Sequence, residues 1–352
     1  MNALSLDTVV LSRDRTALEI LDQTLLPSEI RVLRLTDVRD IWEAIYSLRV
    51  RGAPAIGVCA GYAMALVGAQ IDTDDPAAFS AAFREKKEYL ATARPTAVNL
   101  FWALDRMERV LTEHSDESVP TLRERLFAEA EAIRAEDIAI SRAIGQHGLN
   151  LLHRGDGILT HCNAGTLATA KYGTATAPIY AALEAGWDDL RVYCDETRPL
   201  LQGARLTAFE LHSAGVDTTL LCDNAAASLM AAGKVNIIFV GCDRVARNGD
   251  AANKIGTSAV AILARHYGIP FYVCAPSSTI DMAIPDGSAI PIEQRPGEEV
   301  TEMWYSHRMA PEGIGVYNPA FDVTPSTLIT GIITERGVCR APYEPAFREL
   351  FP

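Results

Sequence analysis

Two segments of the chain place a potentially reactive side chain directly after an apolar run. In THCNAGTLATAKYGT, residues 160–174, Cys162 precedes an Asn-Ala-Gly turn and then a predicted helix. Positive potential at a helix N-terminus lowers the pKa of a neighbouring thiol, so Cys162 is a candidate catalytic group. A Cys-His hydrolase built with the adjacent His161 is disfavoured, because neighbouring residues on a strand point to opposite faces.

The second segment is VGCDRVARNGDAANKIGT, residues 240–257, where Asp243 follows an apolar run. Desolvation at an enclosed strand end keeps a carboxyl group protonated, and it can then serve as a general acid. An isolated aspartate more often caps a turn or pairs with a neighbour such as Arg244. The density of polar residues in this segment favours the catalytic interpretation of Asp243.

Three sites combine a cation or amide with a predicted helix start, where free backbone N–H groups attract anions. Asn253 and Lys254 precede one helix, although Lys254 could equally be a solvated surface lysine. Arg51-Gly52-Ala53-Pro54 and Arg94-Pro95-Thr96 precede two others, and proline at a first helical position leaves the flanking amides available. Arginine adds a forked donor that suits phosphate. A single such arginine would only end a helix, but two in one region favour a phosphate site.

The elements that must position these groups follow from the apolar pattern. Residues 1–120 have helical periodicity after a short β-like opening, and they predict a mainly α-helical domain. The polar stretch EHSDESVPT, residues 113–121, marks the boundary, and a long connecting helix is expected over residues 122–152. After it, short apolar runs alternate with helical stretches and predict a Rossmann-like parallel α/β sheet in a domain of residues 121–352.

The predicted strands end in polar positions that can line a ligand crevice. All five runs end in cysteine, and they cover residues 157–162, 190–194, 218–222, 235–242 and 270–274. Ligands of open α/β sheets bind at the carboxyl ends of the strands. We interpret the cysteines other than Cys162 as small buried hydrophobic side chains. Gln202, in the loop after the second run, could supply an amide to sugar hydroxyls.

Composition excludes several classes of protein. A formal charge of −13 argues against a general nucleic-acid binder. Seven cysteines without paired short spacing, and residues 1–10 without a secretory pattern, indicate reduced thiols, no zinc site and a cytoplasmic location. Residues 53–69 are uncharged, but their glycine, proline and alanine content favours a packed core helix over a membrane span. The chain lacks GxGxxG and GxxxxGK[ST] loops after the predicted strands, so no nicotinamide or ATP cofactor is expected.

Seven motifs together resemble the S-methyl-5-thioribose-1-phosphate isomerase family, almost from end to end. That family shares a superfamily with the regulatory subunits of translation initiation factor 2B and with the ribose-1,5-bisphosphate isomerases. The motifs are RGAPAIG (51–57), ARPTAVNL (93–100), THCNAG (160–165), ETRPLLQGARLTAFEL (196–211), GCDRVARNGDAANKIGT (241–257), PSSTIDMAIPDG (276–287) and FDVTPSTLITGIITERG (321–337).

The resemblance implies an aldose–ketose isomerase of methionine salvage that needs no cofactor or metal and forms a homodimer. It assigns proton donation to Asp243 and the second catalytic role to Cys162. The substrate contacts that it implies are Arg51, Gly52, Ala53, Arg94, Gln202, Asn253 and Lys254. Two alternatives stay open: a ribose-1,5-bisphosphate isomerase, and a non-catalytic regulatory subunit that senses a sugar phosphate or nucleotide. Hydrogen transfer through a C2 proton and by hydride shift also both remain open.

Overall fold

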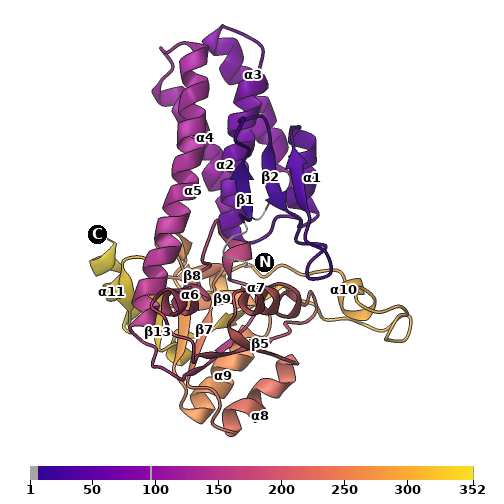
Figure 1. Ribbon diagram of the computed structural model, residues 1–352, viewed down its shortest axis with the longest axis vertical. Helices are drawn as coiled ribbons and strands as arrows, with labels where there is room; N and C mark the ends of the chain where they lie inside the picture. Colours follow the sequence, from indigo (N-terminus) through magenta and orange to yellow (C-terminus); the bar gives the residue numbers. More distant parts are fainter. Residues whose placement is uncertain (1–6, 96, 352) are drawn as a thin grey trace. The chain divides into compact units, whose positions relative to one another are not determined.

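The computed structural model describes residues 7–95 and 97–351 (Figure 1). Residues 1–6 of the N-terminal stretch considered above, and Thr96 of the second arginine-proline helix start, therefore lie outside the described residues. Two compact units make up the chain: unit 1 comprises residues up to 139 with 166–173, and unit 2 comprises residues 140–165 with 174–352. The boundary predicted at residue 120 stays a prediction. The two compact units divide between residues 139 and 140, inside a helix that contributes to both.

Unit 1 is mainly helical, as predicted. A three-stranded antiparallel sheet, β1 (Val9–Leu11), β2 (Leu18–Leu21) and β3 (Val32–Leu35), precedes its helices. Asp37 caps the first helix by accepting a hydrogen bond from the Arg39 N–H. The helices are α1 (Val38–Tyr46), α2 (Ala53–Gln70), α3 (Pro76–Ala91), α4 (Val98–Glu113) and the first part of α5 (Val119–Leu149).

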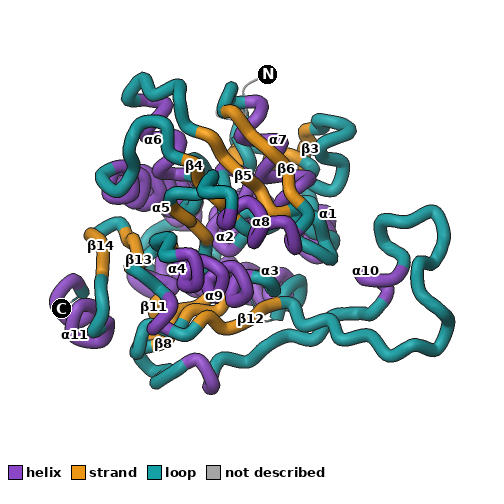
Figure 2. Tube along the Cα trace, turned by 90° about the horizontal axis from the view of Figure 1, so that it is seen from below, coloured by secondary structure: helices purple, strands orange, loops and turns teal. Residues whose placement is uncertain are grey.

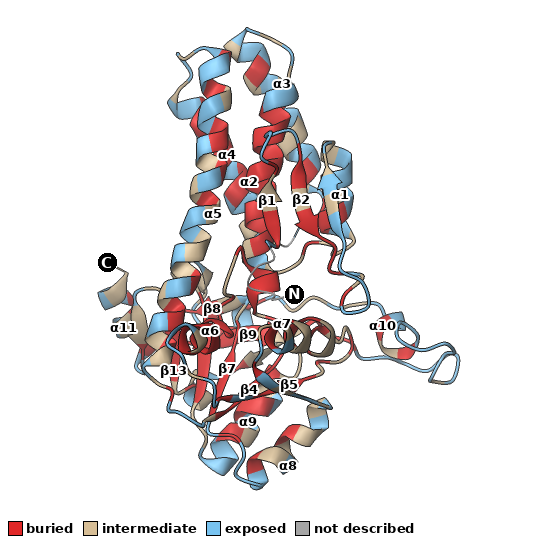
Figure 3. Ribbon diagram, in the orientation of Figure 1, coloured by how far each residue is buried: buried red, intermediate tan, exposed pale blue. Residues whose placement is uncertain are grey.

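Helix α2 is the core of unit 1. It is long and apolar enough to cross a membrane, but 78% of its residues are buried within the protein, and Figure 3 shows it buried along most of its length. Its glycines allow neighbouring side chains to approach closely. An added Cβ at Gly61 would lie 3.0 Å from Ile133 Cδ1, and one at Gly68 would lie 2.6 Å from Leu126 Cδ1. The core-helix interpretation of this segment is thus supported by its packing.

Unit 2 is built on a seven-stranded sheet in which only the edge strand β14 runs antiparallel. This confirms the predicted parallel α/β sheet, and each of the five predicted runs overlaps one of its strands. The strand order is β14-β13-β10-β7-β4-β5-β6. The strands are β4 (Gly157–Thr160), β5 (Arg191–Asp195), β6 (Asp217–Leu221), β7 (Ile237–Val240), β10 (Phe271–Cys274), β13 (Gly331–Thr334) and β14 (Gly337–Cys339).

Helices and a second, smaller sheet complete unit 2. The helices are α6 (Ala177–Glu184), α7 (Ala208–Ser213), α8 (Ala226–Ala231), α9 (Thr257–Tyr267), α10 (Glu298–Thr301) and α11 (Tyr343–Leu350). The small sheet has the order β11-β8-β9-β12 and consists of β8 (Arg244–Ala246), β9 (Ala251–Lys254), β11 (Ile280–Asp281) and β12 (Phe321–Thr324). Its first hairpin, β8–β9, begins immediately after Asp243.

The topology identifies one functional edge of the large sheet. The chain moves from β4 to β5 to β6 in one direction and from β7 to β10 to β13 in the other, so the strand order reverses between β4 and β7. Ligands of open α/β sheets bind beyond the carboxyl ends of the strands at such a switch point. Cys162 follows β4 and Asp243 follows β7. The two sequence candidates therefore follow the two strands that flank the reversal.

Candidate active site

The backbone at Cys162 is strained. Its φ angle is +72°, a left-handed conformation that non-glycine residues adopt rarely and that is found often at functional sites. Two threonines hold this conformation: Thr197 Oγ1 accepts the Cys162 N–H at 2.8 Å, and Thr207 Oγ1 donates to the Cys162 carbonyl at 2.7 Å. The side chain is buried, with 7% of the residue exposed. Gln202 Nε2 lies 3.4 Å from Cys162 Sγ, so two predicted site residues are brought together.

The segment after Cys162 is not the helix that the sequence predicts. A short 3₁₀ turn, Thr166–Ala168, follows the Asn-Ala-Gly turn, and the next α-helix begins only at Ala177. The prediction of an α-helix directly after the Asn-Ala-Gly turn is therefore wrong. Residues 166–173 belong to unit 1.

A π-helical turn positions Gln202 and Thr207. Residues Gly203–Thr207 form one such turn directly after Gln202 and before α7. Glycine is required at its start, because an added Cβ at Gly203 would lie 1.7 Å from the Asp195 carbonyl oxygen. π-helical turns are rare and occur frequently at functional sites. Thr197 and Thr207 were missed from the sequence, although both lie inside the 196–211 motif.

Asp243 lies three residues beyond β7, and its backbone N–H donates to the Ala252 carbonyl at 2.9 Å. The residue is exposed. The sequence-based expectation of an enclosed carboxyl group is therefore not met in this structure. The reason is local: the β8–β9 hairpin begins at this point and takes the backbone out of the buried sheet.

Asn253 and Lys254 lie at the end of β9, just before α9. Asn253 is 5% exposed, and its Nδ2 donates to Thr257 Oγ1 at 3.0 Å. Lys254 Nζ lies 4.2 Å from the centre of the Phe321 ring, and Thr257 Oγ1 donates to the Lys254 carbonyl at 2.7 Å. These contacts place both residues at the entrance to a helix, as predicted. Lys254 is half-buried and its ammonium group contacts an aromatic ring, so it is not a fully solvated surface lysine.

One cluster of possible metal ligands occurs among the described residues. His161, Asp195 and Asp223 offer ligand atoms within 4.8 Å of one another. However, the two ring nitrogens of His161 already contact Asp195 Oδ2 and the Ile255 carbonyl. Both carboxylate oxygens of Asp223 accept backbone N–H groups, from Thr197 and Arg198. The cluster thus fits a hydrogen-bonded network better than a metal centre.

The remaining predicted site residues lie in unit 1, at the N-termini of α2 and α4. Gly52 has a φ angle of +91°, and an added Cβ there would lie 2.5 Å from Ala168 Cα, so only glycine fits. The two helix starts are neighbours, because an added Cβ at Gly57 of α2 would lie 3.3 Å from the Asn99 carbonyl of α4. Arg51 precedes α2 and Arg94 precedes α4.

This arrangement brings two helix N-termini close together, each preceded by an arginine in the sequence. The first N–H groups of a helix have no partner within the helix, and the helix dipole adds positive potential at that end. Two such ends converge here, each preceded by an arginine. Pro54 at the first turn of α2 fixes the backbone for helix entry. The geometry therefore suits a phosphate.

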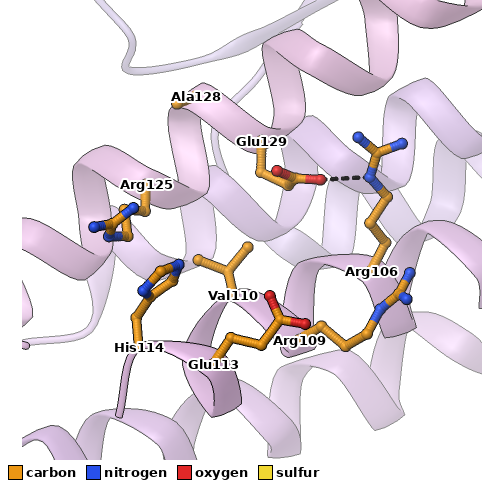
Figure 4. A pocket seen from close by; sticks show the side chains of 8 residues that line it. All are labelled: Arg106, Arg109, Val110, Glu113, His114, Arg125, Ala128 and Glu129. Atoms are coloured by element: carbon orange, nitrogen blue, oxygen red, sulfur yellow. Dashed lines mark hydrogen bonds and ion pairs between the residues drawn. The ribbon is translucent and has the colours of Figure 1, made fainter. Parts of the chain in front are cut away.

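A groove of about 400 Å³ lies elsewhere in unit 1, at the other end of α4 (Figure 4). Its cations are largely paired: Arg106 with Glu129 and Glu136, and Arg125 with Glu117. Arg106 is the first α4 residue of its lining and lies eight residues after Val98, so roughly 12 Å at 1.5 Å per residue separates the groove from the start of α4. The groove is not the predicted phosphate site.

Comparisons with known proteins cover nearly the whole chain. The family model described as Initiation factor 2 subunit family matches residues 49–341. A methylthioribose-1-phosphate isomerase of Symbiobacterium thermophilum is 62% identical over 346 residues, which cover 98% of this chain and 96% of the relative. A 5-deoxyribose 1-phosphate isomerase of Bacillus thuringiensis is 53% identical over 335 residues, covering 95% and 96%. The crystal structure of 5-methylthioribose 1-phosphate isomerase from Pyrococcus horikoshii matches with a TM-score of 0.94 and 43% identity, covering 99% of this chain and 97% of that one.

Proposed function

Because this chain belongs to the initiation factor 2 subunit family, and within it to the methylthioribose-1-phosphate isomerases, we propose that it converts 5-methylthioribose 1-phosphate into 5-methylthioribulose 1-phosphate in methionine salvage. The observation that carries this proposal is the placement of Cys162 and Asp243 after the two strands that flank the reversal of strand order. The non-catalytic regulatory subunit is disfavoured, because a methylthioribose-1-phosphate isomerase is 62% identical over 98% of this chain.

The chemistry of the substrate defines what the residues must do. Its anomeric oxygen carries the phosphate, so the ring cannot open to a free aldehyde. An acid must protonate the ring oxygen as the C1–O bond breaks, and we assign this step to Asp243. The acid has to be protonated to donate, so we infer that bound substrate covers the exposed carboxyl group and excludes water from it.

Cys162 is assigned to the hydrogen transfer from C2 to C1. As a thiolate it removes the C2 proton and gives an enol phosphate, or it assists a direct hydride shift between the two carbons. Reaction in deuterated water separates the routes. Solvent deuterium at C1 supports proton transfer, whereas its absence supports hydride shift or a proton shielded from exchange.

We assign substrate binding to the remaining predicted residues. Arg51, Gly52, Ala53 and Arg94 hold the phosphate at the paired N-termini of α2 and α4. Gln202, Asn253 and Lys254 contact the sugar, and the phosphosugar is the small-molecule partner of the enzyme. The relative named 5-deoxyribose 1-phosphate isomerase, at 53% identity, makes 5-deoxyribose 1-phosphate the second substrate to test.

Replacement of the two catalytic groups tests these roles. Cys162→Ser and Asp243→Asn should each lower kcat about 10²–10⁴-fold while phosphosugar binding persists. Cys222 is exposed, so the interpretation of it as a buried cysteine is wrong. The matched controls Cys222→Ser and Asp217→Asn change exposed residues of unit 2 and should retain turnover. Turnover near the wild-type rate in either catalytic variant would remove that residue from the mechanism.

We also propose that the enzyme is a cytoplasmic homodimer. All seven cysteines are free, and the apolar helix α2 is packed within unit 1. The segment around α10 extends as a long loop (Figure 2) and exposes several large apolar side chains, namely Met303, Trp304, Tyr305, Met309, Ile314 and Tyr317. Exposed apolar patches commonly mark protein interfaces. Light scattering should give twice the chain mass of 38.1 kDa, and a monomer mass would contradict the proposal.

A further inference from the structure

A buried histidine–aspartate pair with no role in the proposed reaction lies beside Cys162. His161 is 1% exposed and Asp195 is 0% exposed, and His161 Nδ1 lies 3.0 Å from Asp195 Oδ2. The pair joins neighbouring strands, because His161 follows β4, Asp195 ends β5, and Thr160 is in register with Cys194. Cys162 is the next residue along the chain.

The hydrogen bonds of His161 require one proton on Nε2 and a second proton shared between Nδ1 and Asp195. Nε2 lies 2.8 Å from the Ile255 carbonyl, and a carbonyl only accepts, so Nε2 must donate. Nδ1 faces a carboxylate oxygen, and a favourable contact needs a proton between these two atoms as well. The pair is therefore either an imidazolium with a carboxylate or a neutral imidazole with a carboxylic acid.

The surroundings favour retention of that proton. Burial opposes the charge on His161, but the hydrogen bond and charge of Asp195, together with Asp223, outweigh it and raise the pKa of His161. The carboxyl group of Asp322 also interacts electrostatically with His161. It accepts hydrogen bonds from the N–H groups of Gly256 at 2.8 Å and Ser258 at 3.1 Å. Three carboxyl groups thus surround one imidazole.

The imidazole also packs directly against the turn after β9. Gly256 has a φ angle of +102°, and an added Cβ there would lie 2.7 Å from His161 Cε1. Ile255, whose carbonyl accepts the Nε2 hydrogen bond, lies between Lys254 and Gly256. The His161 side chain therefore connects the segment that carries Cys162 to the turn that directly follows Lys254.

We propose that His161 and Asp195 are positioning residues, which hold the end of β9 and the turn after it, residues 253–256, at a fixed place relative to Cys162. Through this contact Asn253 and Lys254 are aligned to meet the phosphosugar. The assignment of those two contacts rests on the proposed function. Cys162 itself is held separately, by Thr197 and Thr207.

Variants of the pair test this proposal by kinetics. Because Cys162 keeps its own supports, His161→Ala should raise KM for 5-methylthioribose 1-phosphate about tenfold and lower kcat much less. Asp195→Asn can still donate to Nδ1 and leaves Nε2–H on the Ile255 carbonyl, so KM should stay within about threefold of the wild-type value. His212→Ala, an exposed histidine of α7, is the matched control and should change neither constant.

Amide hydrogen exchange tests the same contact without any turnover. A peptide covering residues 253–258 should exchange about tenfold faster in His161→Ala than in the wild type, and near the wild-type rate in Asp195→Asn. Asp195→Ala, with an intermediate increase expected, replaces His161→Ala if the latter does not fold. Unchanged exchange in a folded variant that lacks the imidazole would overturn the proposal, whatever the activity. Wild-type protein that fails to isomerise the substrate would instead overturn the proposed function alone.

Discussion

At the scale of single residues, the candidate site contains positions that require an unusual backbone angle or leave no room for a larger side chain. Cys162 adopts a φ angle of +72°, and Thr197 in the next loop adopts +63°. Such conformations cost about 1–3 kcal/mol each and persist only when the surroundings enforce them. Here hydrogen bonds between Thr197, Thr207 and the Cys162 backbone enforce the geometry. The strain fixes where the thiol lies.

Gly52→Ala tests a comparable constraint in unit 1. The added methyl group meets both a φ angle of +91° and the Ala168 backbone at 2.5 Å, so we expect a loss of about 3 kcal/mol in unfolding free energy. KM for the phosphosugar should rise as well, because the start of α2 shifts. Denaturant titration and steady-state kinetics provide the two readouts.

Gly186→Ala is the matched control for this substitution. Gly186 also has a positive φ, +77°, but no atom lies within 4 Å of an added Cβ. Gly186→Ala should lower the free energy of unfolding by only about 1 kcal/mol, because the backbone conformation alone opposes the substitution. Equal losses in the two variants would show that the close approach to Ala168 contributes nothing.

Which residues matter was only partly predictable from the sequence. Cys162 and Gln202 were identified, and they lie 3.4 Å apart through Nε2 and Sγ. Thr197 and Thr207 were not, because their role depends on loop backbone angles and on a π-helical turn that no periodicity encodes. The exposure of Asp243 was also unforeseen, since the hairpin that begins there has strands of only three and four residues.

At the scale of elements, the segment Thr166–Gly173 is bound to unit 1 by hydrogen bonds, although it directly follows the Cys162 turn. The hydroxyl of Thr8 donates to the Thr166 carbonyl at 2.9 Å, and Gln23 Nε2 donates to the Leu167 carbonyl at 2.7 Å. The Ala170 N–H donates to Asp137 of α5 at 2.6 Å. Such long-range contacts explain why a helix predicted from local sequence does not form.

The Asp137 contact makes the stability of unit 1 depend on pH. Burial raises the pKa of Asp137 to about 6, although the Ala170 hydrogen bond and Arg134 oppose this shift. A raised carboxyl pKa contributes stability that is present below the ordinary value of 3.8 and lost as pH rises through about 6. Asp137→Asn should therefore match the wild type near pH 4 and exceed it at pH 8, by up to about 3 kcal/mol.

Denaturant unfolding at both pH values measures this difference. The control is Asp116→Asn, the same substitution at an exposed position of unit 1, which should show no such pH-dependent gain. If the wild type and Asp137→Asn have parallel pH profiles between pH 4 and pH 8, Asp137 is not the group responsible.

At the scale of the whole molecule, the fold class could be predicted from the sequence, because apolar residues recur at different spacings in helices and in strands. A helical first part and a second part of short apolar runs were expected, and the seven-stranded sheet contains all five predicted strands. The small sheet β11-β8-β9-β12 was missed, since β9 has the sequence AANK, which lacks β-branched and aromatic residues. The resemblance of seven motifs, rather than composition, identified the family to which the comparisons assign the chain.

The central claim concerns one reaction, so the most direct test is the reaction itself. Purified wild-type protein should convert 5-methylthioribose 1-phosphate to 5-methylthioribulose 1-phosphate, followed by the change of the phosphorus NMR signal from an anomeric to a primary phosphate. We expect kcat/KM for this substrate to exceed that for ribose 1,5-bisphosphate by at least about tenfold, since each 1.4 kcal/mol of differential binding gives that factor. Preference for the bisphosphate, or no turnover of either sugar by folded protein, would contradict the account.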